Sequence, residues 1–275
     1  MVPNTYEFVP GITTRDFFSN PEFLAAAQAE YAANKTGILT SNPTLYAMLP
    51  LSDVTTPQEI KSIVEATTKS LDDKDRSSRD RLLDAIILSQ LTSKDVAQIE
   101  LIWLPQKYSP TAIAEPGKTY LSLLAAVMVP HSRGSIHINS SNPLDYPVIQ
   151  PQVFTQEADR KMTIAGIRLA DKLSRTMPLK QYLVRRTEPT GDGDLTDEEW
   201  WAHVKKTVDG VKHPIGTCSM LPEQRGGVVD HKLRVYGVKG LRVVDASIIP
   251  LHIAQHTQAT VYAIAEKAAD LIRHS

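Results

Sequence analysis

The sequence of 275 residues has little of several features that define common protein classes. It contains one cysteine, Cys218, which excludes a disulfide framework within the chain and any metal site built from several cysteines. It has no run of about 18 apolar residues, and its first residues lack the basic and apolar regions of a secretory signal peptide. Its 30 Lys and Arg residues balance its 31 Asp and Glu residues, which leaves no net basic field to hold nucleic acids or anionic membranes. We therefore expect a cytoplasmic protein that binds a small molecule, without a nucleic-acid, membrane or metal partner.

Glycine-rich nucleotide-binding turns are also missing. Gly191 and Gly193 follow Pro189 and Thr190, not a buried strand, so they do not match a dinucleotide-binding fingerprint. No other glycine run in the chain fits such a turn. With 42% hydrophobic residues, however, the chain can bury a sizeable core, and disorder is excluded.

Proline spacing and apolar periodicity divide the chain into three parts. Residues 1–57 are punctuated by prolines and are interpreted as a loop-rich segment that lines a cavity, with one helix from Pro21 to about Tyr31. Residues 58–210 carry helical and alternating apolar patterns. Residues 211–275 hold the densest group of chemical motifs.

The same periodicity predicts the elements. A mixture of 3.6-residue and two-residue periods indicates helices together with strands of an antiparallel sheet. Bulky side chains that could line a cavity are each assigned to the core when taken singly. These residues are Tyr46, Met48, Phe154, Trp200 and Trp201. Helices are expected around residues 58–91, 158–177, 196–209 and 257–273, and strands around 98–104, 119–129, 134–139 and 241–245.

Motifs near the C-terminus and upstream of it occur in a specific order. They are Leu39-Thr40-Ser41-Asn42, Pro130-His131-Ser132-Arg133-Gly134, Asn142-Pro143, His213-Pro214-Ile215-Gly216-Thr217, Val243-Val244-Asp245-Ala246-Ser247 and His256-Thr257-Gln258. Together they resemble the C-terminal, substrate-domain half of the glucose–methanol–choline (GMC) oxidoreductases. The resemblance covers nearly the whole chain and makes residues 58–210 the substrate-binding domain. It implies an α+β fold, an antiparallel sheet flanked by helices, with an appended C-terminal strand and helix.

The resemblance also implies two catalytic residues. Two positions of that family face the reactive edge of the flavin, and the motifs place them at His213 and His256. A neutral imidazole can accept an alcohol proton at neutral pH, while a second donor fixes the oxygen. Without the family, His213 would instead stabilise a buried turn and His256 would cap the next helix. Cys218 is expected to be buried and inert.

Four further residues would contact FAD if FAD is bound. The resemblance places Asp245, Ala246, Thr257 and Gln258 against the flavin and its diphosphate, with backbone N–H groups at a helix N-terminus. The strand, glycine-rich turn and helix that hold the ADP part of FAD in this family are not found in the sequence. We therefore expect no cofactor in the isolated chain, and FAD only where a dimer or a partner chain completes the site.

The same missing part affects assembly. The strand expected at 241–245 and the last helix would pack on the nucleotide domain in this family, so here they should expose apolar surface. We expect a homodimer or a partner chain to cover that surface.

Three functions are consistent with these features. In the first, an enzyme acts without flavin on a small oxygenated metabolite, such as a polyketide, by histidine-assisted proton transfer that results in cyclisation, dehydration, isomerisation or pericyclic ring formation. In the second, the chain is part of an FAD-dependent alcohol oxidase or dehydrogenase whose nucleotide-binding half is missing or supplied by another chain. In the third, the chain is a noncatalytic small-molecule binder. The enzyme is favoured over the binder.

Overall fold

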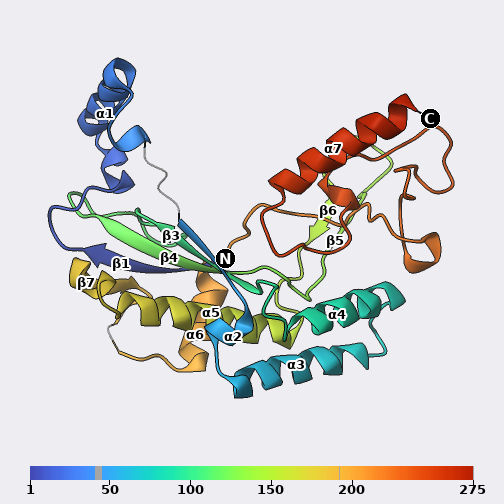
Figure 1. Ribbon diagram of the computed structural model, residues 1–275, viewed down its shortest axis with the longest axis horizontal. Coiled ribbons are helices and arrows are strands. Elements are labelled where there is room, and N and C mark those ends of the chain that lie inside the picture. The colour runs from blue at the N-terminus through green and yellow to red at the C-terminus, as the bar shows by residue number, and fades with distance from the viewer. Residues whose placement is uncertain (41–44, 192, 275) are drawn as a thin grey trace. The chain divides into compact units, whose positions relative to one another are not determined.

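The computed structural model describes residues 1–40, 45–191 and 193–274 (Figure 1). They form two compact units whose segments interleave along the chain, and the three consecutive parts expected from the sequence stay a prediction. We call Met1–Leu49, Ile99–Val127 and Met162–Asp209 the sheet unit. Pro50–Gln98, Met128–Lys161 and Gly210–Ser275 make up the helical unit.

The sheet unit is built on five antiparallel strands in the order β2-β3-β4-β1-β7. The predicted strands at 98–104 and 119–129 are confirmed as β3 and β4, and the helices around the sheet confirm the α+β class. Asn42 and its neighbour Ser41, named among the motifs above, lie outside the described residues. The strands are β1 (Val2–Phe8), β2 (Leu45–Leu49), β3 (Ile99–Leu104), β4 (Tyr120–Val127) and β7 (Leu183–Glu188).

Strand β1 was not predicted, and it lies in the part of the chain, residues 1–57, that was expected to be loop-rich. It lies between β4 and β7 and its first residues are buried. Pro3 and two polar residues hide its period, because a strand buried on both faces is normally read from a continuous apolar run. Both polar residues make hydrogen bonds inside the fold: Asn4 Nδ2 donates to the Ile167 carbonyl at 2.8 Å, and the Thr5 and Ser122 hydroxyls lie 3.0 Å apart. Asn4 Oδ1 is buried without a partner among the described residues.

Helices α5 (Glu157–Ser174) and α6 (Asp197–Thr207) confirm the helices predicted at 158–177 and 196–209. Gly166 lets α5 approach the sheet closely, since a Cβ there would lie 3.0 Å from the Ala125 Cβ. The Thr196 hydroxyl and the Glu199 carboxylate form a capping box at the start of α6. Trp200 is buried as expected.

Two of the predicted core residues are not in the core. Tyr46 and Met48 lie on β2, at the edge of the sheet, and both are exposed. Strand alternation alone could not reveal this, because it does not tell an edge strand from a central one. Phe154 and Trp201 are half-buried.

A buried ionic cluster stabilises the sheet unit between α5 and the strands. The Asp171 carboxylate accepts hydrogen bonds from Arg186 Nη1 at 2.7 Å and from the Tyr6 hydroxyl at 3.0 Å. Burial, and then the charge of Asp171, raise the pKa of Tyr6 above its usual range. Removal of either charged side chain of this cluster would therefore leave the opposite charge buried without its counterpart.

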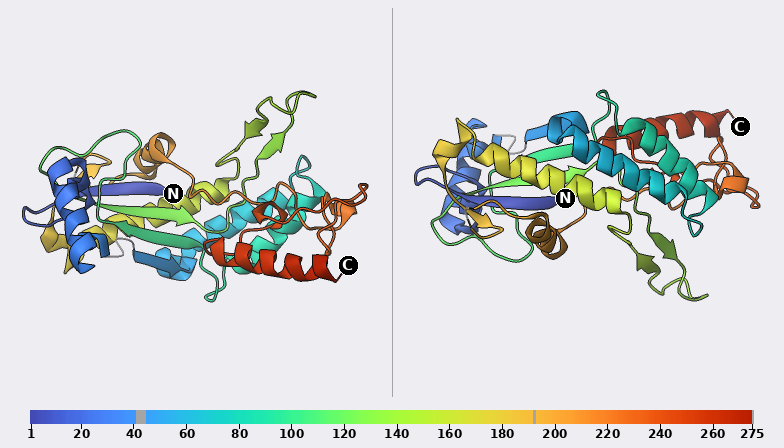
Figure 2. Two further views of the ribbon diagram at one scale, coloured as in Figure 1. Left: turned by 90° about the horizontal axis from the view of Figure 1, so that it is seen from above. Right: turned by 90° about the horizontal axis from the view of Figure 1, so that it is seen from below.

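The helical unit confirms the helical pattern of residues 58–91, but divides it into α3 (Pro57–Leu71) and α4 (Ser78–Gln90). The interruption begins at Asp72, and Ser77 then caps α4 through a hydrogen bond to the Asp80 N–H. The strand expected at 134–139 is shorter, β5 (Ser135–His137), and it pairs with β6 (Val148–Gln150) to form a hairpin that projects as a narrow arm (Figure 2).

The predicted strand at 241–245 is not formed. This segment has a single bridge, between Arg242 and Arg234, with backbone bonds at Leu241 and Val243 on either side of it. Gly237 and Gly240 both have positive φ, so the chain turns sharply just before residue 241. The segment before this turn is too short to form a ladder of paired residues with 241–245.

The last predicted helix is confirmed as α7 (Gln258–Arg273), and it packs on a small core of its own. This core is formed by Val229, Leu233, Ile248 and Ala268. In the described part of the chain, no helix combines the length and apolarity that a bilayer crossing needs. The other elements are η1 (Arg15–Ser19), α1 (Pro21–Asn34, capped by Asn20 as its sequence predicts), η2 (Ile38–Thr40), α2 (Leu51–Val54), η3 (Leu179–Tyr182), η4 (Glu223–Arg225) and η5 (Ala246–Ile248).

Candidate functional site

The two histidines singled out by sequence lie side by side in the helical unit. The ring centroids of His213 and His256 are 5.0 Å apart and the rings meet edge to face, at 77°. Both side chains are half-buried. Two imidazoles at this distance can act on the two ends of one small polar group, one as base and one as acid.

Backbone hydrogen bonds hold the His213 loop against η5. The Cys218 N–H donates to the Ser247 carbonyl at 2.9 Å, and the next pairing joins Met220 to Ile248 at 2.8 Å. Gly216 has a φ of 84° and receives the Ser219 hydroxyl on its carbonyl. Cys218 is a free thiol that is half-buried, less enclosed than predicted. Cys218 contributes to this loop through its backbone N–H, which makes the hydrogen bond to Ser247.

His256 immediately precedes α7. The N-cap of this helix is Thr257, and Thr257 makes no capping hydrogen bond with its side chain. The first turn of α7 thus presents backbone N–H groups without a side-chain cap, at the place where the histidine pair lies. Ala254, two residues before His256, has a φ of 56°, which turns this loop sharply.

A third histidine, His252, belongs to the same cluster and was not assigned a role from the sequence. Burial first, and then the charges of Arg133 and His213, together lower its pKa to about 4. Among the described residues, Arg133 Nε and Nη2 have no hydrogen-bond acceptor, so its charge acts on its surroundings without a direct ion pair at these atoms. No signal in the sequence links His252 to Arg133, because the two residues lie far apart along the chain.

A carboxylate fixes the loop that carries Arg133. Asp159 Oδ1 accepts the His131 N–H at 2.8 Å and Oδ2 accepts the Ser132 N–H at 2.8 Å, while His131 Nδ1 lies 3.3 Å from Oδ1. Burial alone would raise the pKa of Asp159, but the bonds from His131 and Ser132 prevail and lower it. His131 also meets the Thr67 hydroxyl and is fully buried, so its role is to hold the loop.

The four residues expected to face a flavin lie on η5 and at the start of α7. The Asp245 carboxylate is engaged locally, because it accepts the Ser247 N–H at 2.8 Å. Ala246 is half-buried, Thr257 is buried and Gln258 is exposed. The uncapped N–H groups of α7 suit an electron-rich oxygen, so this end of the helix fits a flavin ring. Both described sheets are antiparallel, so neither offers the parallel strands that bind the ADP part of a dinucleotide.

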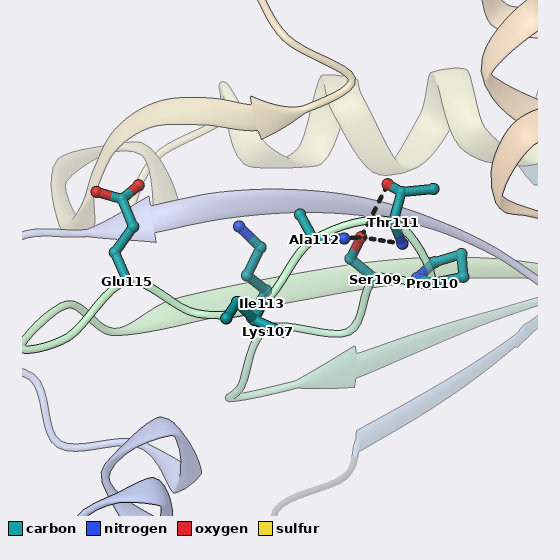
Figure 3. A pocket seen from close by; sticks show the side chains of 7 residues that line it. All are labelled: Lys107, Ser109, Pro110, Thr111, Ala112, Ile113 and Glu115. Carbon is teal, nitrogen blue, oxygen red and sulfur yellow. Dashed lines mark hydrogen bonds between the residues drawn. The ribbon is translucent and has the colours of Figure 1, made fainter.

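The sheet unit contains a pocket of its own, about 660 Å³ in volume, along the loop from Lys107 to Glu115 (Figure 3). Its polar edge is formed by the hydroxyls of Ser109 and Thr111, 3.2 Å apart, and the Lys107 Nζ lies over the Tyr120 ring. None of the residues singled out above lines this pocket. Within the described ranges, no group of three or more His, Cys, Asp or Glu side chains could hold a metal ion.

Comparison with known proteins decides the family. A family model described as GMC oxidoreductase matches residues 130–265, which include His213, His256 and the Arg133 loop. These residues form a GMC oxidoreductase C-terminal domain. The dehydrogenase mpl7 of Monascus purpureus is 33% identical over 98% of this chain, which spans 45% of that protein. Versicolorin B synthase stcN of Emericella nidulans is 40% identical over 57% of the chain, which spans 25% of that enzyme.

Solved GMC-type structures share the fold. An FAD-dependent oxidoreductase from Chaetomium thermophilum superposes with a TM-score of 0.81 and 25% identity, over 99% of this chain and 47% of that one. The chain thus spans about half the length of the relatives that match it throughout. Its residues correspond to a GMC substrate-binding domain, as its antiparallel sheet and flanking helices show.

Proposed function

We propose that this GMC-like chain is an enzyme of secondary metabolism that acts, without flavin, on a small oxygenated metabolite such as a polyketide. The observation that carries the proposal is the pair of rings 5.0 Å apart, His213 and His256. A relative that is named as a synthase, versicolorin B synthase, supports a reaction other than oxidation on this scaffold. A cytoplasmic location is part of the proposal.

The chemistry needs one neutral and one protonated imidazole. The neutral ring takes a proton from a C–H or O–H group of the substrate, and the protonated ring gives one to a carbonyl or a departing hydroxyl oxygen. Dehydration, isomerisation and cyclisation all follow this scheme, and a pericyclic ring closure needs the enclosed site alone. His252, whose pKa is about 4, stays uncharged at neutral pH and so adds no positive charge to the pair.

FAD-dependent oxidation of an alcohol is the second candidate. It is favoured by the dehydrogenase that matches nearly the whole chain and by the uncapped start of α7. Asp245, Ala246, Thr257 and Gln258 would hold the flavin, and the remaining contacts would come from a second copy or another chain. Bound FAD would accept the hydride, while the histidine pair takes the hydroxyl proton.

The visible absorption spectrum separates the two candidates. The purified chain is mixed with excess FAD and freed of unbound ligand before the spectrum is measured. We expect a colourless protein. A yellow protein with about one flavin per chain would replace the first candidate with alcohol oxidation.

Turnover then tests the histidines. A panel of β-hydroxy ketones is followed by the ultraviolet absorbance of the enone formed by loss of water, and a panel of alcohols with FAD by oxygen uptake. His213→Ala and His256→Ala are compared with His231→Ala, an exposed histidine of the same C-terminal segment. Equal turnover in all variants would reject the two histidines as base and acid, and ligand binding without turnover would make the chain a noncatalytic binder.

A further inference from the structure

The loop that lines the pocket of the sheet unit is fixed to the sheet at several points. Asp16 Oδ1 accepts the Lys107 N–H and Oδ2 accepts the Tyr120 N–H, both at 2.7 Å. Between these points, the Tyr108 N–H donates to the Ser122 hydroxyl at 2.8 Å. A binding site that is ordered in advance loses less conformational entropy when a ligand enters it. The loop therefore offers a preformed site.

The two hydroxyl groups of the pocket already use their protons within the protein. The Thr111 hydroxyl donates to Glu188 Oε1 at 2.7 Å, so the contact of 3.2 Å between Thr111 and Ser109 uses the Ser109 proton (Figure 3). Ser109 Oγ also accepts the N–H groups of Thr111 and Ala112, at 3.1 and 3.0 Å. A ligand thus finds no free hydroxyl proton at this edge of the pocket.

Lys107 keeps its three side-chain donors. Its half-buried Nζ lies 4.7 Å from the centre of the Tyr120 ring, and in the described part of the chain no hydrogen-bond acceptor or carboxylate pairs with it. Glu115 also lines the pocket but is engaged elsewhere, because Lys118 Nζ lies 2.8 Å from its Oε2 and Arg185 Nη2 lies 4.0 Å from its Oε1. An ammonium group of this kind needs acceptors for its N–H groups.

Apolar side chains form much of the remaining wall. Pro110, Ala112 and Ile113 are all exposed, and Ile113 is exposed to 90%. Small-molecule sites typically have volumes of about 300–1,000 Å³ and combine apolar walls with a few polar groups that fix the orientation of the ligand. The pocket of about 660 Å³ lies within that range. A ligand that matches it has an apolar part and one group that accepts hydrogen bonds.

We propose that this pocket binds a small organic acid, whose carboxylate contacts Lys107 Nζ and whose hydrocarbon part covers Ile113. A carboxylate accepts hydrogen bonds and donates none, which suits a pocket whose side chains keep donors on the lysine alone. Inorganic phosphate would leave the apolar wall uncovered, so an organic anion fits better. The site shares no residue with the histidine pair and does not depend on the reaction proposed for it.

Amide NMR spectra of the full chain, recorded during titration with benzoate and separately with benzamide, test the site. Benzamide has nearly the same shape as benzoate but no charge. We expect benzoate to shift the signals of residues 107–115 and to bind about tenfold more tightly than benzamide, because hydrogen bonds between charged groups are the stronger ones. Lys107→Met removes the charge at nearly the same length. It should weaken benzoate binding about tenfold and leave benzamide binding nearly unchanged.

Lys180→Met is the matched control, because Lys180 is an exposed lysine of the same unit that does not line the pocket. It should leave the affinity for both probes unchanged. Far-ultraviolet circular dichroism checks that both variants are folded. A chain that binds neither probe, or binds benzoate no more tightly than benzamide, overturns the proposal, and so does unchanged benzoate binding in Lys107→Met. None of these results depends on turnover, so the site and the proposed function are tested separately.

Discussion

The sheet unit and the C-terminal segment 210–275 hold their residues in place by different means. In the sheet, five strands pair in registered ladders, and the Asn4 amide nitrogen and the Thr5 hydroxyl of β1 have partners across the fold. In the C-terminal segment the backbone makes isolated bridges, and Lys212 and Ala254 beside the two site histidines have φ near 60°. The regular part supplies a stable frame, whereas the irregular part can aim side chains at one another.

The sharpest test of this difference is the loss of a site histidine. His213→Ala should lower kcat/KM by about 10²–10⁴-fold, the range for loss of a general acid or base, while the midpoint of urea unfolding stays close to that of the wild type. Steady-state kinetics and urea titration measure the two quantities. Equal falls in activity and stability would place His213 in the frame and not in the chemistry.

In the sheet unit, by contrast, we expect loss of a buried charged residue to lower the free energy of unfolding. Asp171→Ala leaves the Arg186 guanidinium buried without its carboxylate, and should lower the free energy of unfolding by about 3–5 kcal/mol. Urea unfolding followed by circular dichroism measures the loss. Asp194→Ala, at a carboxylate exposed to solvent, serves as the control and should change it by less than about 1 kcal/mol. Similar losses in both variants would contradict the role of the buried cluster.

The irregular part should contribute to the pH dependence of stability. His252 has a pKa of about 4 in the folded chain against about 6.5 when unfolded, so the unfolded chain takes up the proton first as pH falls. The contribution of His252 to the free energy of unfolding should thus be level above pH 6.5 and should fall by up to about 3 kcal/mol between pH 6.5 and 4. His252→Gln should reduce this slope in urea titrations at each pH. An unchanged slope would show that other groups cause it.

Substitutions at the helix caps should have the smallest effect on stability. Thr196→Ala removes the capping box of α6 and should cost about 1 kcal/mol, whereas Thr196→Ser keeps the hydroxyl and most of the stability. Thr257 makes no such bond, so Thr257→Ser should leave the stability nearly unchanged. Thermal unfolding of the three variants measures the order. A larger loss at Thr257 would mean that its hydroxyl matters to the site region in another way.

The elements that sequence could predict are those with a clear period. Helices α5, α6 and α7 and strands β3 and β4 repeat apolar residues at their own spacing, and motif order indicated that His213 and His256 belong together. Strand β1 was missed because Pro3 and Asn4 break its pattern, and its partners lie far along the chain. The strand at 241–245 was overpredicted, because alternation of Val and Leu cannot show that sharp turns leave it without a neighbour. The environment of His252 depends on Arg133, which only the folded chain brings close.

The order of the strands also affects how the chain is made. Val2 pairs with Ala125, and Phe8 pairs with Leu183. At 5–20 residues per second, a ribosome needs about 10–35 s to reach Leu183 after it has passed Phe8. Until β4 is made β1 has neither neighbour, and until β7 is made it lacks the second one, so one edge of β1 stays open to chaperones and to other nascent chains. Proline and polar residues oppose cross-β stacking of such a segment. The same residues that hide β1 from a reading of the sequence thus protect it while it waits for its partners.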